Sequence, residues 1–254
     1  MIGGDAAFPA MGVIMAKYHR SVLVSLALLT LVACGGGGGG GGSSSPNPVT
    51  STASFPAAQA IANFFSTSHT YNVNGTGKFS GIDVSGTGTV SFSSAVGATF
   101  EGQSAFKVTL TVAITLSGGG QTVPVAFSVE NYFTTNYDPL GFNDPGGGSY
   151  CVIQGNPSYP SSVKVGDTAT LYTQNCYQDS TKNTPTENDI DSFLVEADTA
   201  TSAIFNLIEN TYTGGTLTDN SQERYRIDEN GNFDFVSVTG VDYTGGDTLI
   251  LTAH

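Results

Sequence analysis

Two acids, Asp189 and Asp191, are the first residues whose spacing could support catalysis. They are two positions apart, so they would lie on the same side of an extended segment, an arrangement that general acid–base chemistry can use. The pair follows directly on a polar stretch, residues 179–189, which we expect to form a loop. Acids in such segments are normally exposed to solvent. We therefore expect solvated loop acids here and predict no catalytic residue.

Histidines are too few to favour a nucleophilic site. After the leader described below, the chain holds only His69 and the last residue, His254. A Ser-His-Asp or Cys-His arrangement needs a positioned imidazole. The segment around Ser104, residues 102–106, lacks the glycine two positions after the serine that a nucleophile elbow requires. His69 is expected to be a solvated loop histidine.

Metal-binding patterns are equally weak. A zinc site needs three or four nitrogen or sulfur ligands, and the sequence shows no such cluster. Residues 228–234 (DENGNFD) are rich in oxygen ligands, but a calcium loop of the EF-hand type has glycine at position 6 and glutamate at position 12. Here glycine is at position 4 and Thr239 is at position 12. The sequence therefore predicts no metal and no cofactor.

Cys34 has the most specific chemical context in the chain. It follows a basic stretch (Lys17, His19 and Arg20), an apolar run over residues 21–30, and small residues. The apolar run is too short to span a bilayer, which takes about 20 residues, and the layout is that of a secretory signal. A cysteine thiolate at the exit of such a signal is the nucleophile that thioether formation requires.

The motif Leu31-Val32-Ala33-Cys34 resembles the lipobox of bacterial lipoproteins. The resemblance covers about residues 17–34, and the glycines that follow (Gly35 to Gly42) are similar to the start of polyglycine-tethered envelope lipoproteins of proteobacteria. It implies cleavage before Cys34, a diacylglyceryl group on its sulfur and acylation of the new N-terminus. More than one acyl chain gives stable anchoring. Because residue 35 is not aspartate, which retains members of this family at the inner membrane, the resemblance implies the outer membrane. A plain secretory signal with an accidental cysteine is the alternative.

The leader is expected to comprise residues 1–33. Its first part, residues 1–14, contains Asp5 and Pro9 but no positive charge, unlike the start of a signal peptide. We therefore expect translation to begin at Met11 or Met15.

Cys151 and Cys176 are expected to form a disulfide. The compartment beyond the inner membrane is oxidising, and the pair has neither C-x-x-C spacing nor a histidine near it in sequence. The bond would close a loop of about 25 residues and contribute roughly 3.5 kcal/mol on the chain-entropy model.

The charge of the chain excludes one class of partner. Removal of the leader leaves 6 basic and 20 acidic residues, a formal charge of 6 − 20 = −14. Such a surface repels nucleic acid and anionic headgroups. No Lys/Arg cluster offsets it, and Arg224 and Arg226 form the densest basic spot. We therefore predict no nucleic-acid partner.

The elements that must position these residues begin after a tether. Residues 34–53 hold the lipidated cysteine and a Gly/Ser/Pro spacer that spans roughly 25 Å. Residues 54–66 predict a helix, with Ser54 as the N-cap, Pro56 in the first turn, and Ile61, Phe64 and Phe65 on one face.

Period-two alternation dominates the remainder. Residues 106–116 and 123–129 flank a glycine turn and predict an antiparallel hairpin, in which Pro124 favours an edge strand or a strand that bonds only on its other side. Asn230-Gly231 predicts a second hairpin. Further strands are expected at residues 78–84, 88–93, 98–101, 163–165, 169–172, 193–197, 203–213, 224–228, 233–238 and 248–252. We predict a mainly β domain over residues 54–254, an antiparallel sandwich or partly open barrel with one short N-terminal helix. Two similar halves would meet in a loop-rich stretch near residues 140–160.

These features favour a membrane-anchored envelope lipoprotein with a non-catalytic binding or structural role. One alternative is a periplasmic carrier of an apolar ligand in a half-barrel, which would need a cavity of roughly several hundred Å³. The other is a hydrolase of envelope polymers, which would bring His69 or an acid pair to a cleft.

Overall fold

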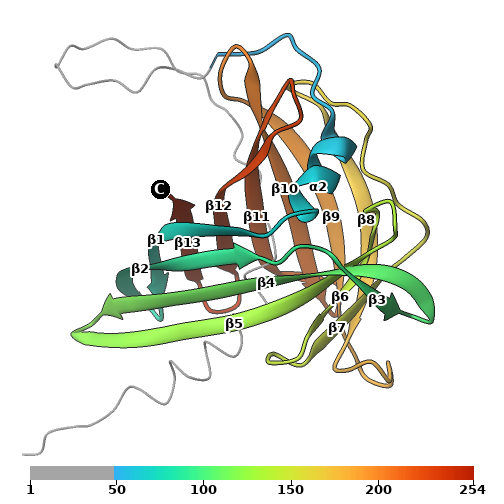
Figure 1. Ribbon diagram of the computed structural model, residues 1–254. Helices are drawn as coiled ribbons and strands as arrows, with labels where there is room; N and C mark the ends of the chain where they lie inside the picture. The colour runs from blue at the N-terminus through green and yellow to red at the C-terminus, as the bar shows by residue number, and fades with distance from the viewer. Residues whose placement is uncertain (1–48) are drawn as a thin grey trace, which may run out of the picture.

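The computed structural model describes residues 49–254, and the leader, Cys34 and most of the tether lie outside that range. One helix precedes a long series of strands (Figure 1). Their bounds are α2 Ala57–Phe65, β1 His69–Phe79, β2 Ile82–Phe92, β3 Val96–Phe100, β4 Gln103–Gly118, β5 Gln121–Phe133, β6 Pro139–Asp144, β7 Ser149–Ile153, β8 Thr168–Tyr177, β9 Pro185–Ala197, β10 Ser202–Thr213, β11 Thr216–Asp228, β12 Phe233–Asp242 and β13 Asp247–Ala253.

The strands form a single antiparallel sheet that closes on itself. Sequential neighbours pair from β4 through to β13, β13 pairs with β1, and β1 pairs with β2. The pairing of β2 with β4 completes the ring, and β3 lies beside the first part of β4. The predicted mainly β class with one short helix is confirmed, and the ring gives it the form of a barrel of 12 strands. A closed ring satisfies the backbone groups that the edges of an open sheet would expose.

The β4–β5 hairpin forms as its alternation predicts. Valines and leucines on one face of β4 are buried, and the threonines between them are more exposed. Pro124 lies in a part of β5 that pairs only with β4, because β6 pairs with β5 from Glu130 to Phe133. The missing N–H of proline therefore interrupts no hydrogen bond between strands, as expected.

Four local predictions are wrong. Residues 163–165 do not form the expected strand, since Val163 makes only an isolated bridge to Phe55. The expected strand at residues 78–84 is the tight turn between β1 and β2, where Ser80 and Gly81 take φ values of 49° and 81°. The expected loop at residues 140–160 holds β6 and β7, so one sheet runs through this segment. The resemblance between the two halves stays a prediction. The polar loop expected at residues 179–189 ends early, since β9 begins at Pro185.

The helix forms where it was expected, but its cap and the boundary of the tether differ from the predictions. Pro56, not Ser54, occupies the N-cap position, and the Ser54 hydroxyl instead bonds to the hydroxyl of Ser162. Ordered contacts begin before the expected boundary at residue 54. The Val49 amide donates to Asp198 O at 3.2 Å, and the Ser51 hydroxyl donates to Ala200 O at 2.8 Å. Residues 49–53 therefore lie against the β9–β10 hairpin.

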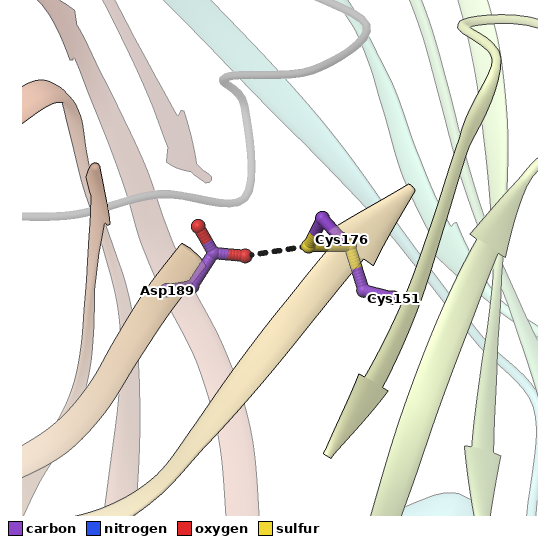
Figure 2. A group of neighbouring side chains, drawn as sticks. All are labelled: Cys151, Cys176 and Asp189. Atoms are coloured by element: carbon purple, nitrogen blue, oxygen red, sulfur yellow. Dashed lines mark hydrogen bonds between the residues drawn. A yellow bond between two sulfur atoms is a disulfide. The ribbon is translucent and has the colours of Figure 1, made fainter. Parts of the chain in front are cut away.

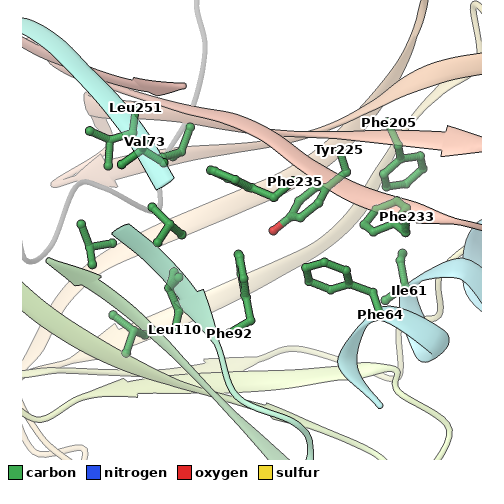
Figure 3. Packing of buried hydrophobic residues seen from close by; sticks show 14 of the residues in the cluster. Ile61, Phe64, Val73, Phe92, Leu110, Phe205, Tyr225, Phe233, Phe235 and Leu251 are labelled. Carbon is green, nitrogen blue, oxygen red and sulfur yellow. The ribbon is translucent and has the colours of Figure 1, made fainter. Parts of the chain in front are cut away.

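The apolar face of α2 packs into the barrel. Ile61 and Phe64 are buried, and the ring of Phe64 meets those of Phe92, Tyr225 and Phe233 edge to face at 5.1, 5.6 and 5.8 Å (Figure 3). Such pairs stabilise a core beyond the area that they bury. The helix thus holds one side of the aromatic core in place.

Candidate functional site

A cavity of about 100 Å³ lies inside the barrel, between the aromatic core and strands β8 to β11. One part of its wall is apolar and includes Phe65, Phe92 and Phe142. The other part is polar and consists mainly of acids and phenols, namely Asp191, Glu209, Glu223, Tyr159 and Tyr172, with Gln174. The cavity therefore combines carboxyl groups with aromatic rings.

The register of the sheet places the acids side by side. Asp191 on β9 lies opposite Tyr172 on β8 and opposite Glu209 on β10. In the next row, Asp189 lies opposite Gln174 and Thr211. Side chains two residues apart on a strand share a face, so both acids of β9 point the same way as the buried Phe193 and Val195. The inward face of β9 is therefore apolar at Phe193 and Val195 and acidic at Asp189 and Asp191.

The acid pair on β9 is buried, so the prediction of solvated loop acids is wrong. Asp189 and Asp191 are 2% and 8% exposed. Gln174 donates from Nε2 to Asp189 Oδ2 and to Glu209 Oε1, both at 3.1 Å. Two oxygens, Asp189 Oδ1 and Asp191 Oδ2, are buried without a hydrogen-bond partner. A buried polar atom without a partner is costly, and it calls for an explanation such as a bound ligand.

Burial raises the pKa of every acid in this cluster. The pKa of Asp189 rises to about 6, chiefly through desolvation. Desolvation also raises the pKa of Glu223, and it raises the pKa values of Asp191 and Glu209 well above their usual range, with further contributions from neighbouring acids. Two carboxylates that lie opposite each other repel, so the cluster favours keeping protons.

Basic side chains of the described residues do not neutralise this cluster. Lys78, Lys107, Lys182, Arg224 and Arg226 form ion pairs with acids elsewhere, and no Lys or Arg within residues 49–254 lines the cavity. Once its acids ionise, the cavity therefore carries a negative charge that no lining Lys or Arg of residues 49–254 neutralises.

Cys151 and Cys176 form a disulfide next to the acid cluster. They lie opposite each other on β7 and β8, with Cα atoms 4.0 Å apart (Figure 2). Asp189 Oδ2 lies 3.0 Å from the sulfur of Cys176. A disulfide sulfur carries no hydrogen, so a hydrogen bond here takes its proton from the Asp189 carboxyl, in agreement with the raised pKa of this group. Although the two cysteines and Asp189 converge, sulfurs that are bonded to each other do not supply the thiolates that a metal site needs.

Replacement of both cysteines by alanine is expected to lower the free energy of unfolding by about 3.5 kcal/mol, because the bond closes a loop of 25 residues in the unfolded chain. Urea denaturation of the double variant, followed by circular dichroism, measures the loss. A Ser149→Ala variant, which changes a buried neighbour on the same strand, serves as the control. Equal stability of the double variant and the parent would contradict this prediction.

The other residues considered in the sequence lie apart from the acid cluster. His69 is not the solvated loop histidine that was expected, because it is the half-buried first residue of β1. It stacks on Phe64 with ring centroids 4.3 Å apart, and its Nε2 lies 2.9 Å from Phe64 O. Asp228 accepts hydrogen bonds from the amides of Asn230 and Asn232 at 2.9 Å and so stabilises the predicted hairpin turn. Gln103 to Phe106 begin β4. None of these residues lines the cavity, and they form no triad with its acids.

The sequence reasoning missed Glu209, Glu223 and Tyr172. The sequence contains a pattern that could have revealed Glu209, because Phe205, Leu207 and Glu209 occupy alternate positions of one strand. An acid at an inward position of an otherwise apolar alternation is unusual, since acids are rarely buried without a partner. The same reasoning applied to Phe193 and Val195 would have placed Asp191 inside.

Within residues 49–254, no helix is long and apolar enough to cross a membrane. The chain matches no protein-family model, no curated protein and no solved structure, so its function has to be inferred from its own residues.

Proposed function

We propose that this chain is a lipid-anchored protein of the bacterial envelope whose barrel binds a small molecule without transforming it. The lipobox-like motif ending in Cys34 supports the anchor, and the spacer after it supports a barrel that stands off the outer membrane. The observation that carries the binding role is the unpartnered Asp191 Oδ2 at the wall of an interior cavity. A ligand that donates to this oxygen would remove the cost of burying it.

The size of the cavity favours this role over an apolar carrier and over a hydrolase that would act inside the barrel. About 100 Å³ is well below the roughly 300 Å³ at which ligand pockets for larger molecules begin. An apolar cargo would also meet the carboxyl groups of Asp191, Glu209 and Glu223, which is unfavourable. A segment of polymer would not fit in this space. A ligand of a few heavy atoms fits it best.

The anchor is tested on the full-length chain in native membranes. Mass spectrometry is expected to show a mature protein that begins at Cys34 and carries acyl groups, and Cys34→Ser is expected to abolish the modification and release the barrel from the membrane. A matched Ser43→Ala change in the tether should alter neither result. An unmodified thiol at Cys34, or cleavage elsewhere, would contradict the anchor.

The binding role is tested by NMR on the mature chain with a set of molecules of three to six heavy atoms that covers cations, neutral molecules and anions. Shifts are expected at residues that line the cavity. Ser221→Leu, which fills space at the cavity wall, is expected to abolish them. Ser128→Leu on the exposed face of β5 serves as the matched control and should leave them unchanged. Absence of binding by every class would overturn the proposal.

A further inference from the structure

We infer that the cavity binds a small organic monocation, a protonated amine, in exchange for a proton held by its acids. This inference rests on the proposed binding role and names the class of ligand. It begins at Asp191, which is more than nine-tenths buried, lines the cavity and leaves Oδ2 without a partner. Tyr172 forms a hydrogen bond with this carboxyl group, but Oδ2 itself has no partner among residues 49–254, so it can accept a hydrogen bond from a donor in the cavity.

The surrounding charges select a positive donor. The titratable groups that face or act on Asp191 are all acids or phenols: Tyr159, Tyr172, Asp189, Glu209 and Glu223. The groups that act in turn on Asp189, Glu209 and Glu223, namely Asp219, Glu187 and Tyr225, are acids or phenols as well. A cation among these groups offsets the repulsion between carboxylates, and the low dielectric of the interior strengthens the attraction. A neutral donor would satisfy Oδ2 but leave this repulsion in place.

The remaining wall favours an organic cation over a metal ion. Hard divalent ions take about six oxygen ligands that converge closely. Within residues 49–254, the only group of three possible ligands that meet within 4.8 Å is the disulfide pair with Asp189, and no three carboxylates do so. The rings of Phe65, Phe92 and Phe142 instead offer surface for alkyl groups and for cation–π contact.

The volume limits the size of the ligand. A cavity of 150 Å³ accommodates benzene, which has six heavy atoms, so about 100 Å³ accommodates about four. An alkylammonium with three carbons meets this limit. Its ammonium group would donate to Asp191 Oδ2 while its carbons lie against the aromatic wall.

The exchange conserves charge and atoms. Asp191 and Glu209 lie opposite each other, and burial beside other acids raises the pKa of both. The empty site therefore holds a proton that a solvated pair would have released. When the ammonium enters, one carboxyl O–H bond breaks, the proton leaves to solvent, and the carboxylate accepts a hydrogen bond from the ammonium. No covalent bond to the ligand forms, and one positive charge enters for each one that leaves.

The test is calorimetric titration of the mature chain with isopropylammonium, 2-propanol and acetate, which each have four heavy atoms but are positive, neutral and negative. We expect the cation to bind at least tenfold more tightly than either of the others. Its affinity should rise up to tenfold per pH unit between pH 6 and 8, because the amine stays protonated while the site gives up its proton. Titration in two buffers with different ionisation enthalpies should count about one proton released per cation bound.

Asp191→Asn is expected to lower the affinity at least tenfold and to abolish the proton release. Glu209→Gln provides a second variant if Asp191→Asn does not fold, and it should reduce both quantities. Asp83→Asn, at an exposed acid on β2, is the matched control and should change neither. Equal binding of 2-propanol would leave the binding role intact and overturn this inference. Cation binding without proton release would overturn the exchange, and binding of none of the three would overturn this inference and count against the binding role.

Discussion

Gly86→Ala is expected to prevent proper closure of the barrel and to lower the free energy of unfolding by more than about 4 kcal/mol. A Cβ on Gly86 would lie 1.8 Å from Thr115 O, far inside any contact distance, and the atom it meets is backbone. Gly86 lies in β2 opposite Leu116 of β4, so the clash falls on the pairing that completes the ring. Guanidinium denaturation followed by circular dichroism measures the loss.

The control for this substitution is Gly97→Ala on β3. Gly97 is also a strand glycine of the same sheet, but a Cβ there meets nothing within 4 Å. This variant should retain stability within about 1 kcal/mol of the parent. Equal stability of Gly86→Ala and Gly97→Ala would contradict the explanation that glycine at position 86 allows the two backbones to approach closely.

The ligand-free protein is expected to lose several kcal/mol of stability between pH 5 and 8, in contrast to proteins whose acids are solvated. The buried acids have raised pKa values, so in this range the folded state holds more protons than the unfolded state, and stability falls as the pH rises. For Asp189, a rise from 3.8 to about 6 corresponds to a loss on the order of 3 kcal/mol once the pH exceeds the folded value. This stability is fully present below about pH 4.

Asp191→Asn combined with Glu209→Gln is expected to remove the part of this loss that comes from Asp191 and Glu209, to leave the part that comes from Asp189, and to raise stability at pH 8. Urea denaturation at several pH values, in phosphate buffer free of amines, measures the dependence. Glu101→Gln is the control, since the hydrogen bond from Lys182 lowers the pKa of Glu101, and its contribution to stability is lost only as the pH falls. Parent stability that rises from pH 5 to 8 would contradict the assignment of these acids as buried and protonated.

Local patterns in the sequence were enough to predict the strand-rich fold. The alternation in residues 106–129 and the Asn230-Gly231 turn led to correct hairpins, because both depend on neighbours in sequence. The closure of the ring was not predicted, since the pairing of β2 with β4 depends on close approach at Gly86 and Gly88, which no local pattern records.

The acid cluster could not be assembled from the sequence for a related reason. Asp191, Glu209 and Tyr172 come from three strands, and only the register places them in one row. The composition around residues 179–189 is that of a loop, so the pair on β9 was assigned to solvent. The disulfide was easier to predict, because the compartment expected from the leader is oxidising and leaves two cysteines few other partners.

The pairing of β1 with β13 has a consequence for how the molecule is made. This seam joins Val73 to Ala253, so the ring cannot close until the final residues of the chain are present. Contacts so distant in sequence form slowly, because the entropy of closing a long loop must be lost first. The ring of such a chain is completed only after β13 has been synthesised. That suits a protein that would be threaded through a translocation channel and would assemble only on the far side.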